Sequence, residues 1–153
     1  MGRFERNTPK NFGGSYVAPE IEDGKRPGNF ILIEKICDMM KYGLPLVDNF
    51  PRRNRKIADT MRESMCEMLH LAVRLEKKYY KKTTLEDLDI ELAVLKKFIV
   101  IASDRDYCGE RFAPPLTLHQ RDIWSRQNEE IGKLIGGYKK YIDGKTSSDG
   151  SRP

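Results

Sequence analysis

The residues with the most reactive side chains are few in this chain and do not cluster in the sequence. The two histidines fall on different predicted helices, His70 beside an apolar stripe and His119 in a first turn close to solvent. The three cysteines are widely separated and odd in number, so they indicate neither a disulfide framework nor a CxxC metal or redox motif. Two of them, Cys37 and Cys66, lie within helical apolar patterns, which predicts buried thiols.

Motifs that bind phosphate or activate a nucleophile are missing from the sequence. It contains no P-loop, no GxGxxG dinucleotide fingerprint and no GxSxG nucleophile elbow. The adjacent carboxylates of Glu129 and Glu130 would point in different directions on a helix, so solvated charge accounts for them better than acid–base chemistry. We therefore predict no catalytic residue, no metal site and no cofactor, and keep an enzyme with an unrecognised site as a third alternative.

Basic residues concentrate in one predicted helix. The chain has a net charge of +5, and the stretch 51–82 holds ten basic residues against four acidic ones. The cations near its C-terminal end are Lys77, Lys78, Lys81 and Lys82. The helix dipole stabilises positive charge at this end, which is enough to account for them. The cations near its N-terminal end, which the dipole disfavours, are Arg52, Arg53, Arg55 and Lys56. A cluster placed against its local electrostatics indicates an anionic partner, and arginine suits bidentate phosphate contact. Both groups are candidates for nucleic-acid or protein contact.

Glycines inside the last predicted helix are a second unusual feature. Each costs on the order of 1 kcal/mol relative to alanine in a helix interior. Gly132 and Gly136 are about one turn apart, so they form a smooth stripe that another backbone can approach closely. Gly137 follows, and Tyr138 supplies a large amphipathic anchor. We interpret these four residues as contacts for helix packing within the fold or for a subunit interface.

Four amphipathic helices are predicted, because apolar residues recur at intervals of three and four residues in four stretches. The stretches cover about 29–49, 51–82, 83–103 and 117–143. Pro45 is expected to kink the first helix or to break it near Gly43, and Pro51 suits the first position of the second helix. Short connections between the helices predict an all-α fold, an antiparallel up-down-up-down four-helix bundle.

Local signals predict where two helices begin and which face of the last one is buried. Capping boxes, in which two side chains bond each other's backbone N–H groups, pair Thr83 with Glu86 and Thr117 with Gln120. The predicted buried stripe of the last helix consists of Ile123, Gln127, Ile131, Leu134, Ile135, Tyr138 and Ile142.

The polar ends of the sequence divide it into three parts. We expect a flexible basic and aromatic arm over 1–28, the bundle over 29–143 and a disordered tail over 144–153. No apolar stretch approaches the roughly 20 residues that cross a bilayer, and no secretory signal pattern is present. The sequence therefore predicts a soluble cytoplasmic protein without membrane contact.

Two short motifs on these helices resemble a known family. The first is YGLP (42–45) followed by FPRR (50–53) and a basic amphipathic helix, and the second is EIGKLIGGY (130–138). Both resemble the accessory variability determinant family of diversity-generating retroelements. The four-helix proteins encoded in intervening sequences of large-subunit ribosomal RNA genes are a related set. The resemblance covers roughly residues 30–141.

The resemblance implies a four-helix bundle that assembles into a barrel-shaped homopentamer with a basic surface. Such proteins bind the retroelement's reverse transcriptase and its template RNA, with DNA or an RNA/DNA hybrid as further ligands. They support mutagenic cDNA synthesis, while the polymerase performs the chemistry. On this view the cations at 52–56, with Lys96 and Lys97 of the third helix, contact RNA or the polymerase. One departure is Val100, which stands where the family often has a second basic residue.

Two binding functions therefore remain. The first is a non-catalytic accessory subunit that binds a reverse transcriptase and its RNA. The second is a structural oligomer of the ribosomal intervening-sequence type without a polymerase partner. The first predicts a steep fall of RNA affinity with salt, because basic residues release counterions when they bind phosphates. The second predicts weak and indiscriminate binding.

Overall fold

The computed structural model describes residues 27–77 and 81–150, with the side chains of 31–77 and 81–144. Four α-helices occupy this part of the chain: α2 (Pro27–Asp48), α3 (Arg55–Lys77), α4 (Lys82–Ser103) and α5 (Leu118–Gly150). Two short 3-10 helices, η1 (Arg52–Asn54) and η2 (Arg105–Tyr107), lie in the α2–α3 and α4–α5 connections. The described residues include no strand, so the predicted all-α class is confirmed.

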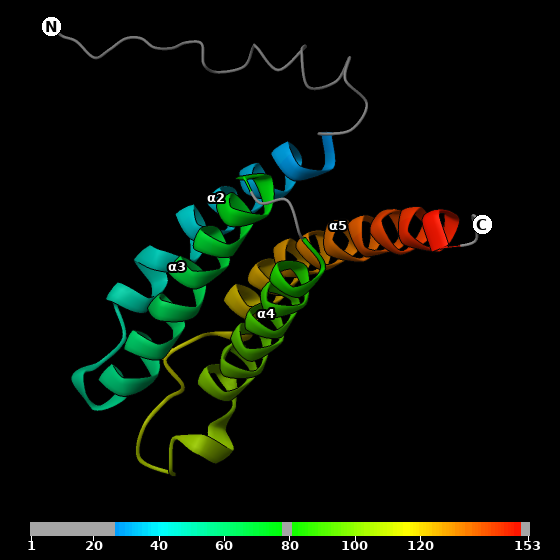
Figure 1. The fold of residues 1–153 in the computed structure, drawn as a ribbon. Helices are drawn as coiled ribbons and strands as arrows, with labels where there is room; N and C mark the ends of the chain where they lie inside the picture. The colour runs from blue at the N-terminus through cyan, green and yellow to red at the C-terminus, as the bar shows by residue number, and fades with distance from the viewer. Residues whose placement is uncertain (1–26, 78–80, 151–153) are drawn as a thin grey trace, which may run out of the picture.

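The four helices form an antiparallel bundle (Figure 1). Each helix packs against its neighbours in the chain, and α5 completes the ring by packing against α2 as well as α4. At 33 residues α5 is the longest of the described helices, and its C-terminal part extends beyond the N-terminal end of α4 (Figure 1). We call the end of the bundle that carries η1, η2 and the connection 104–117 the loop end.

One apolar face of each helix is buried in a common core. Methionines supply much of it on the side formed by α2 and α3: Met39, Met61, Met65 and Met68 are all fully buried. Their unbranched side chains fill irregular space beside the large indole of Trp124, which is also fully buried. Leucines dominate α4, with Leu85, Leu88, Leu92 and Leu95 in the core.

The buried face of α5 differs from the predicted one by one position. Trp124 and Asn128 are fully buried, whereas Ile123 and Gln127, which we expected in the core, are only partly buried. The offset ends one turn later, because Ile131, Ile135 and Tyr138 are buried as predicted. Neighbouring positions on a helix are about 100° apart, so an apolar pair such as 123 and 124 leaves the direction of the face open.

The two predicted capping boxes have different outcomes. The box at α5 is confirmed: the Thr117 N–H donates to Gln120 Oε1 and the Gln120 N–H donates to Thr117 Oγ1, both at 3.0 Å. Thr83 as the N-cap of α4 is wrong, because α4 begins at Lys82. The Leu85 N–H already donates to the Lys81 carbonyl at 2.9 Å, so the helical hydrogen bonds begin upstream of Thr83.

The prolines of the first connection also differ from expectation. Helix α2 runs without a break through Gly43 and Pro45, so of the two expected outcomes the break near Gly43 is wrong, and the kink at Pro45 stays a prediction. Pro45 is exposed, which lets water satisfy the carbonyl that loses its helical partner. Pro51 caps η1 with φ of −62°, and α3 itself begins at Arg55.

The predicted division of the chain can be compared with the structure only in part. Residues 1–26 of the expected arm and 151–153 of the expected tail lie outside the described residues. Helix α2 starts at Pro27, and α5 continues to Gly150, beyond the residue 143 at which we expected the bundle to end. None of the described helices combines the length and apolar character needed to span a bilayer.

Candidate nucleic-acid interface

The first basic cluster lies on the surface of the loop end. Arg52 and Arg53 belong to η1, and Arg55 and Lys56 form the start of α3. All four residues are exposed. We call Arg52, Arg53, Arg55 and Lys56 the loop-end cluster. The tight turn after α2 places them at one end of the bundle, where the first N–H groups of α3 add further positive potential.

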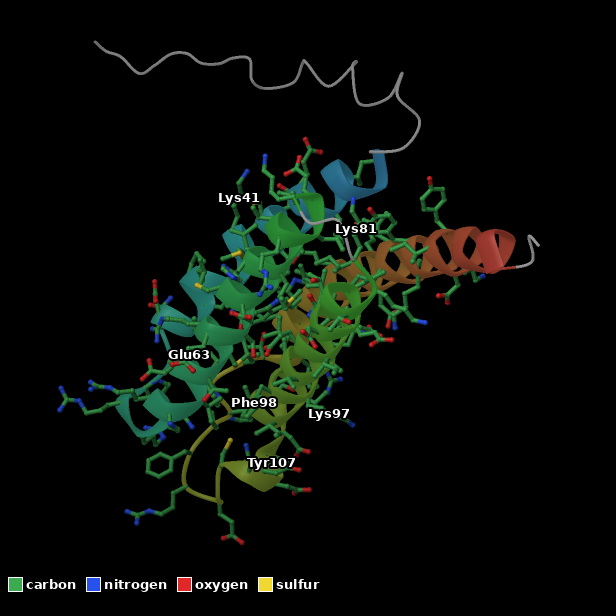
Figure 2. All side chains as sticks on the ribbon, viewed as in Figure 1. Lys41, Glu63, Lys81, Lys97, Phe98 and Tyr107 are labelled. Atoms are coloured by element: carbon green, nitrogen blue, oxygen red, sulfur yellow. The ribbon has the colours of Figure 1, made fainter. Side chains whose placement is uncertain are left out.

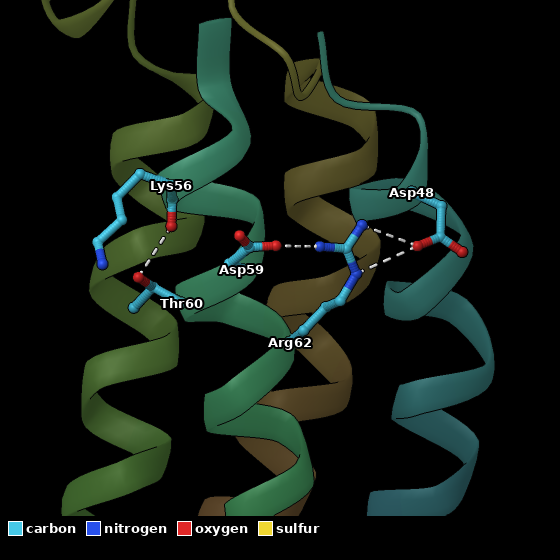
Figure 3. A network of polar contacts seen from close by, with 5 residues as sticks. All are labelled: Asp48, Lys56, Asp59, Thr60 and Arg62. Atoms are coloured by element: carbon cyan, nitrogen blue, oxygen red, sulfur yellow. Dashed lines mark hydrogen bonds and ion pairs between the residues drawn. The ribbon is translucent and has the colours of Figure 1, made fainter. Parts of the chain in front are cut away.

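The acidic residues that flank this cluster in sequence are engaged elsewhere (Figure 3). Arg62 donates from Nη1 to Asp59 Oδ1 at 2.7 Å, and from Nη2 and Nε to Asp48 Oδ1 at 3.0 and 3.2 Å. One arginine therefore joins α3 to the end of α2 and holds both carboxylates, although its single positive charge offsets only one of their two negative charges. Among the described residues, no carboxylate lies within 4.0 Å of a cation of the loop-end cluster. The cluster keeps its charge available for an external anion.

An aromatic ring from the α4–α5 connection completes this surface. The guanidinium carbon of Arg53 lies 3.9 Å from the centroid of the Phe112 ring. Phe112 remains 41% exposed. An exposed contact of this kind stabilises by about 0.5–1 kcal/mol, and it ties the connection to η1. Sequence reasoning missed Phe112, since no local pattern links positions 53 and 112.

The second basic group lies at the opposite end of the bundle. With 23 residues, α3 is about 35 Å long and separates the two groups by its full length. Figure 2 shows Lys81 and Tyr107 near opposite ends of the molecule. Lys81 donates to the Tyr138 hydroxyl at 3.4 Å, and Lys82 pairs with Asp143 at 3.8 Å. Lys77 is exposed, and Lys78 lies outside the described residues. The structure therefore does not unite the ten predicted basic contacts into one surface.

Lys96 and Lys97 occupy the middle of α4 and differ in environment. Lys97 is exposed (Figure 2), whereas Lys96 is half-buried beside α5. A Cβ added to Gly132 would lie 3.7 Å from Lys96 Nζ and 3.6 Å from a methyl carbon of Leu92, which is ordinary contact. Gly132 therefore adjoins the ammonium of Lys96 without a forced close approach.

The other members of the glycine motif behave differently. A Cβ added to Gly136 or Gly137 would meet no heavy atom within 4 Å in the described chain. Packing inside the bundle therefore gives no reason for these two glycines, and a subunit interface stays a prediction. Tyr138 is buried in the core, and its ring stacks on that of Tyr141 with centroids 6.3 Å apart.

A small cavity between the start of α4 and α5 also carries basic residues. Its lining includes Lys82 and Lys139 together with Asp143. Lys139 donates to Asp89 Oδ2 at 2.7 Å, and this hydrogen bond raises the pKa of Lys139. Since both lysines already have carboxylate partners, this cavity is a weaker anion site than the loop-end cluster.

The residues with reactive side chains are dispersed. Glu67 and His70 have the Glu-x-x-His spacing found in metal-binding bundles, which sequence reasoning overlooked, but both are exposed. The described residues contain no group of three potential metal ligands. The buried-thiol prediction is wrong for Cys66, which is exposed, and Cys37 is half-buried. Burial raises the pKa of the Cys37 thiol, with a further contribution from Asp38, so this thiol is a weak nucleophile.

The fold and this surface define a class: a four-helix-bundle protein with an arginine-rich end. Comparison with protein families gives a more specific result, because the profile of the bAvd-like family matches residues 30–142. The chain belongs to this family of accessory proteins, and the resemblance to accessory variability determinants is confirmed. Comparison with curated proteins found no match.

Proposed function

We propose that this protein is the accessory subunit of a retroelement reverse transcriptase and that it binds the template RNA through the loop-end cluster. In this proposal the polymerase performs mutagenic cDNA synthesis, and the bundle supplies binding surface and no catalytic group. The subunits act as a symmetric homo-oligomer, a pentamer, which would repeat the cluster around the assembly. Membership of the bAvd-like family supports this assignment.

The main structural support for RNA contact is the pairing of Arg62 with both nearby carboxylates. Because Arg62 binds both Asp48 and Asp59, four neighbouring cations have no described carboxylate partner. Exposed cations that bind phosphates release condensed counterions, which drives association. Three of the four cations are arginines, whose planar donor groups fit phosphate oxygens in pairs.

Charge reversal tests the proposal. The first variant changes the four cations of the loop-end cluster to glutamate. The control changes four exposed cations elsewhere by the same total charge: Lys41, Arg74, Arg126 and Lys140. Affinity for a fluorescent single-stranded RNA is measured by anisotropy between 50 and 300 mM salt, values chosen around the physiological range of about 150 mM.

The cluster variant is expected to lose binding at moderate salt, with helicity unchanged. Its salt dependence should flatten by about 3 in the slope of log K against log salt, since each single-strand phosphate contact contributes roughly 0.7. The control should retain most of its affinity. Equal losses in the two variants would show that only net charge matters. That result would favour the structural oligomer of the intervening-sequence type.

A further inference from the structure

We propose that Phe112 and Arg53 form a stacking platform for an unpaired base, so that the loop end selects single-stranded over duplex nucleic acid. The inference rests on the proposed function, since it specifies which form of nucleic acid the loop-end cluster binds. A direct contact joins that cluster to an exposed aromatic ring.

Both Arg53 and Phe112 are exposed enough to contact a nucleic acid. Arg53 lies 3.9 Å from the ring centroid, so its guanidinium covers part of one face of Phe112. The Phe112 side chain is nevertheless 41% exposed, and Arg53 is itself exposed. A guanidinium stacked on a ring keeps its N–H donors directed outward in its own plane, where phosphate oxygens can accept them. One pair thus offers a charged donor group and an apolar surface side by side.

The contact also fixes the position of the connection relative to the charges. Residues 104–117 join α4 to α5, while Arg53 belongs to η1 at the start of α3. The Leu116 N–H donates to the Ala102 carbonyl at 3.1 Å, and Leu116 is buried, so the connection is tied to the bundle close to Phe112. The ring is therefore held at the edge of the loop-end cluster by its own contact with Arg53 and by the anchoring of Leu116, four residues further along the chain.

This combination distinguishes between forms of nucleic acid. In an A-form duplex the base faces are stacked inside, so a protein reaches mainly phosphates and 2′-hydroxyls. An aromatic ring gains little from such a partner, whereas an unpaired base presents its face to the ring and its phosphate to a nearby cation. Arginines alone would bind both forms. The exposed ring beside them favours the single strand.

The test compares a fluorescent single-stranded RNA of mixed sequence with the same strand annealed to its complement, using the full chain. Phe112→Ala is expected to weaken single-strand binding about tenfold, the effect of removing one stacked base contact, and to change duplex binding less than twofold. Phe112→Leu keeps apolar bulk without the aromatic face and should behave like Phe112→Ala. Leu118→Ala removes another large exposed apolar side chain at the loop end and should leave both affinities unchanged.

Phe112→Trp gives a positive signal for stacking. The chain has one tryptophan, Trp124, which is fully buried, so additional emission that responds to RNA comes from position 112. We expect this variant to bind single strands at least as well as the native chain, with its emission quenched on binding. Quenching by the single strand and not by the duplex supports the platform.

The outcomes separate this inference from the proposed function. If Phe112→Ala reduces single-strand and duplex affinity equally, or if Phe112→Leu binds like the native chain, the ring only supports the connection and the platform is wrong. In that case charge reversal of the loop-end cluster would still abolish RNA binding. If charge reversal leaves RNA binding intact, the proposed function itself fails at this surface.

Discussion

The indole of Trp124 occupies the space beside Gly43 that a Cβ at this position would take. A Cβ at position 43 would lie 2.8 Å from Trp124 Cε2 and 3.0 Å from Met65 Sδ. Tyr42 packs edge-on against the same indole, with centroids 6.5 Å apart and an interplanar angle of 83°. Tyr42 and Gly43 of α2 therefore form the surface against which Trp124 of α5 packs. This packing explains why a glycine is present in the helix interior, where it lowers helix stability relative to alanine.

Gly43→Ala should destabilise the protein by about 1–3 kcal/mol, because the added methyl group overpacks the core against the ring. Urea unfolding followed by circular dichroism measures the loss. Gly144→Ala is the matched control, since position 144 lies in α5 with open space around a Cβ, and alanine should stabilise it by up to about 1 kcal/mol. Equal effects of the two substitutions would contradict the role assigned to Gly43.

Asn128→Leu should stabilise the protein. Asn128 is fully buried, and neither Nδ2 nor Oδ1 has a hydrogen-bond partner among the described residues. A buried amide without partners costs about 1–3 kcal/mol, and leucine has a similar size without that cost. Thermal unfolding should show a higher midpoint for the variant. A lower midpoint would mean that the amide is hydrogen-bonded in solution.

Arg62→Gln should weaken RNA binding without removing any cation of the loop-end cluster. The substitution releases Asp48 and Asp59, which then lie as free charges beside the cluster and oppose an anionic ligand. Stability should fall by less than about 1 kcal/mol, since these are surface pairs. The triple variant Asp48→Asn, Asp59→Asn, Arg62→Gln should recover the affinity. Failure of this recovery would show that Arg62 itself contacts RNA.

Gly136→Leu should dissociate the oligomer and leave the helical content of the subunit unchanged. A Cβ at this position would meet no heavy atom within 4 Å in the described chain, so we expect the main conflict of a leucine there to be with a neighbouring subunit. Light scattering coupled to size exclusion reports the mass, and circular dichroism reports the fold. An unchanged mass together with unchanged stability would show that the glycine stripe packs against nothing.

The features that local sequence determines were predictable. Helical periodicity identified four helices and their bundle, since each repeats apolar residues over several turns. The Thr117–Gln120 capping box depends on residues three positions apart, and it forms as predicted. The Thr83 box failed because the helical hydrogen bonds begin two residues earlier, with the Lys81 carbonyl accepting from the Leu85 N–H.

The features that depend on tertiary packing were not predictable from one sequence. The seat of Trp124 on Gly43 joins residues of α2 and α5, and the pattern of α5 alone favoured Ile123 for the core. By contrast, the loop-end cluster was identified from its conflict with the helix dipole, and its separation from Lys81 and Lys82 follows from the length of α3. The contact of Arg53 with Phe112 depends on how the α4–α5 connection folds over η1.

We propose that this bundle is the accessory subunit of a reverse transcriptase. Affinity purification of the tagged protein from its own host, with nuclease treatment before elution, tests the claim most directly. We predict that a reverse transcriptase co-elutes in stable stoichiometry and that its recovery does not depend on intact RNA. Recovery of the bundle alone, as a clean oligomer, would contradict the claim and leave a structural oligomer without a polymerase partner.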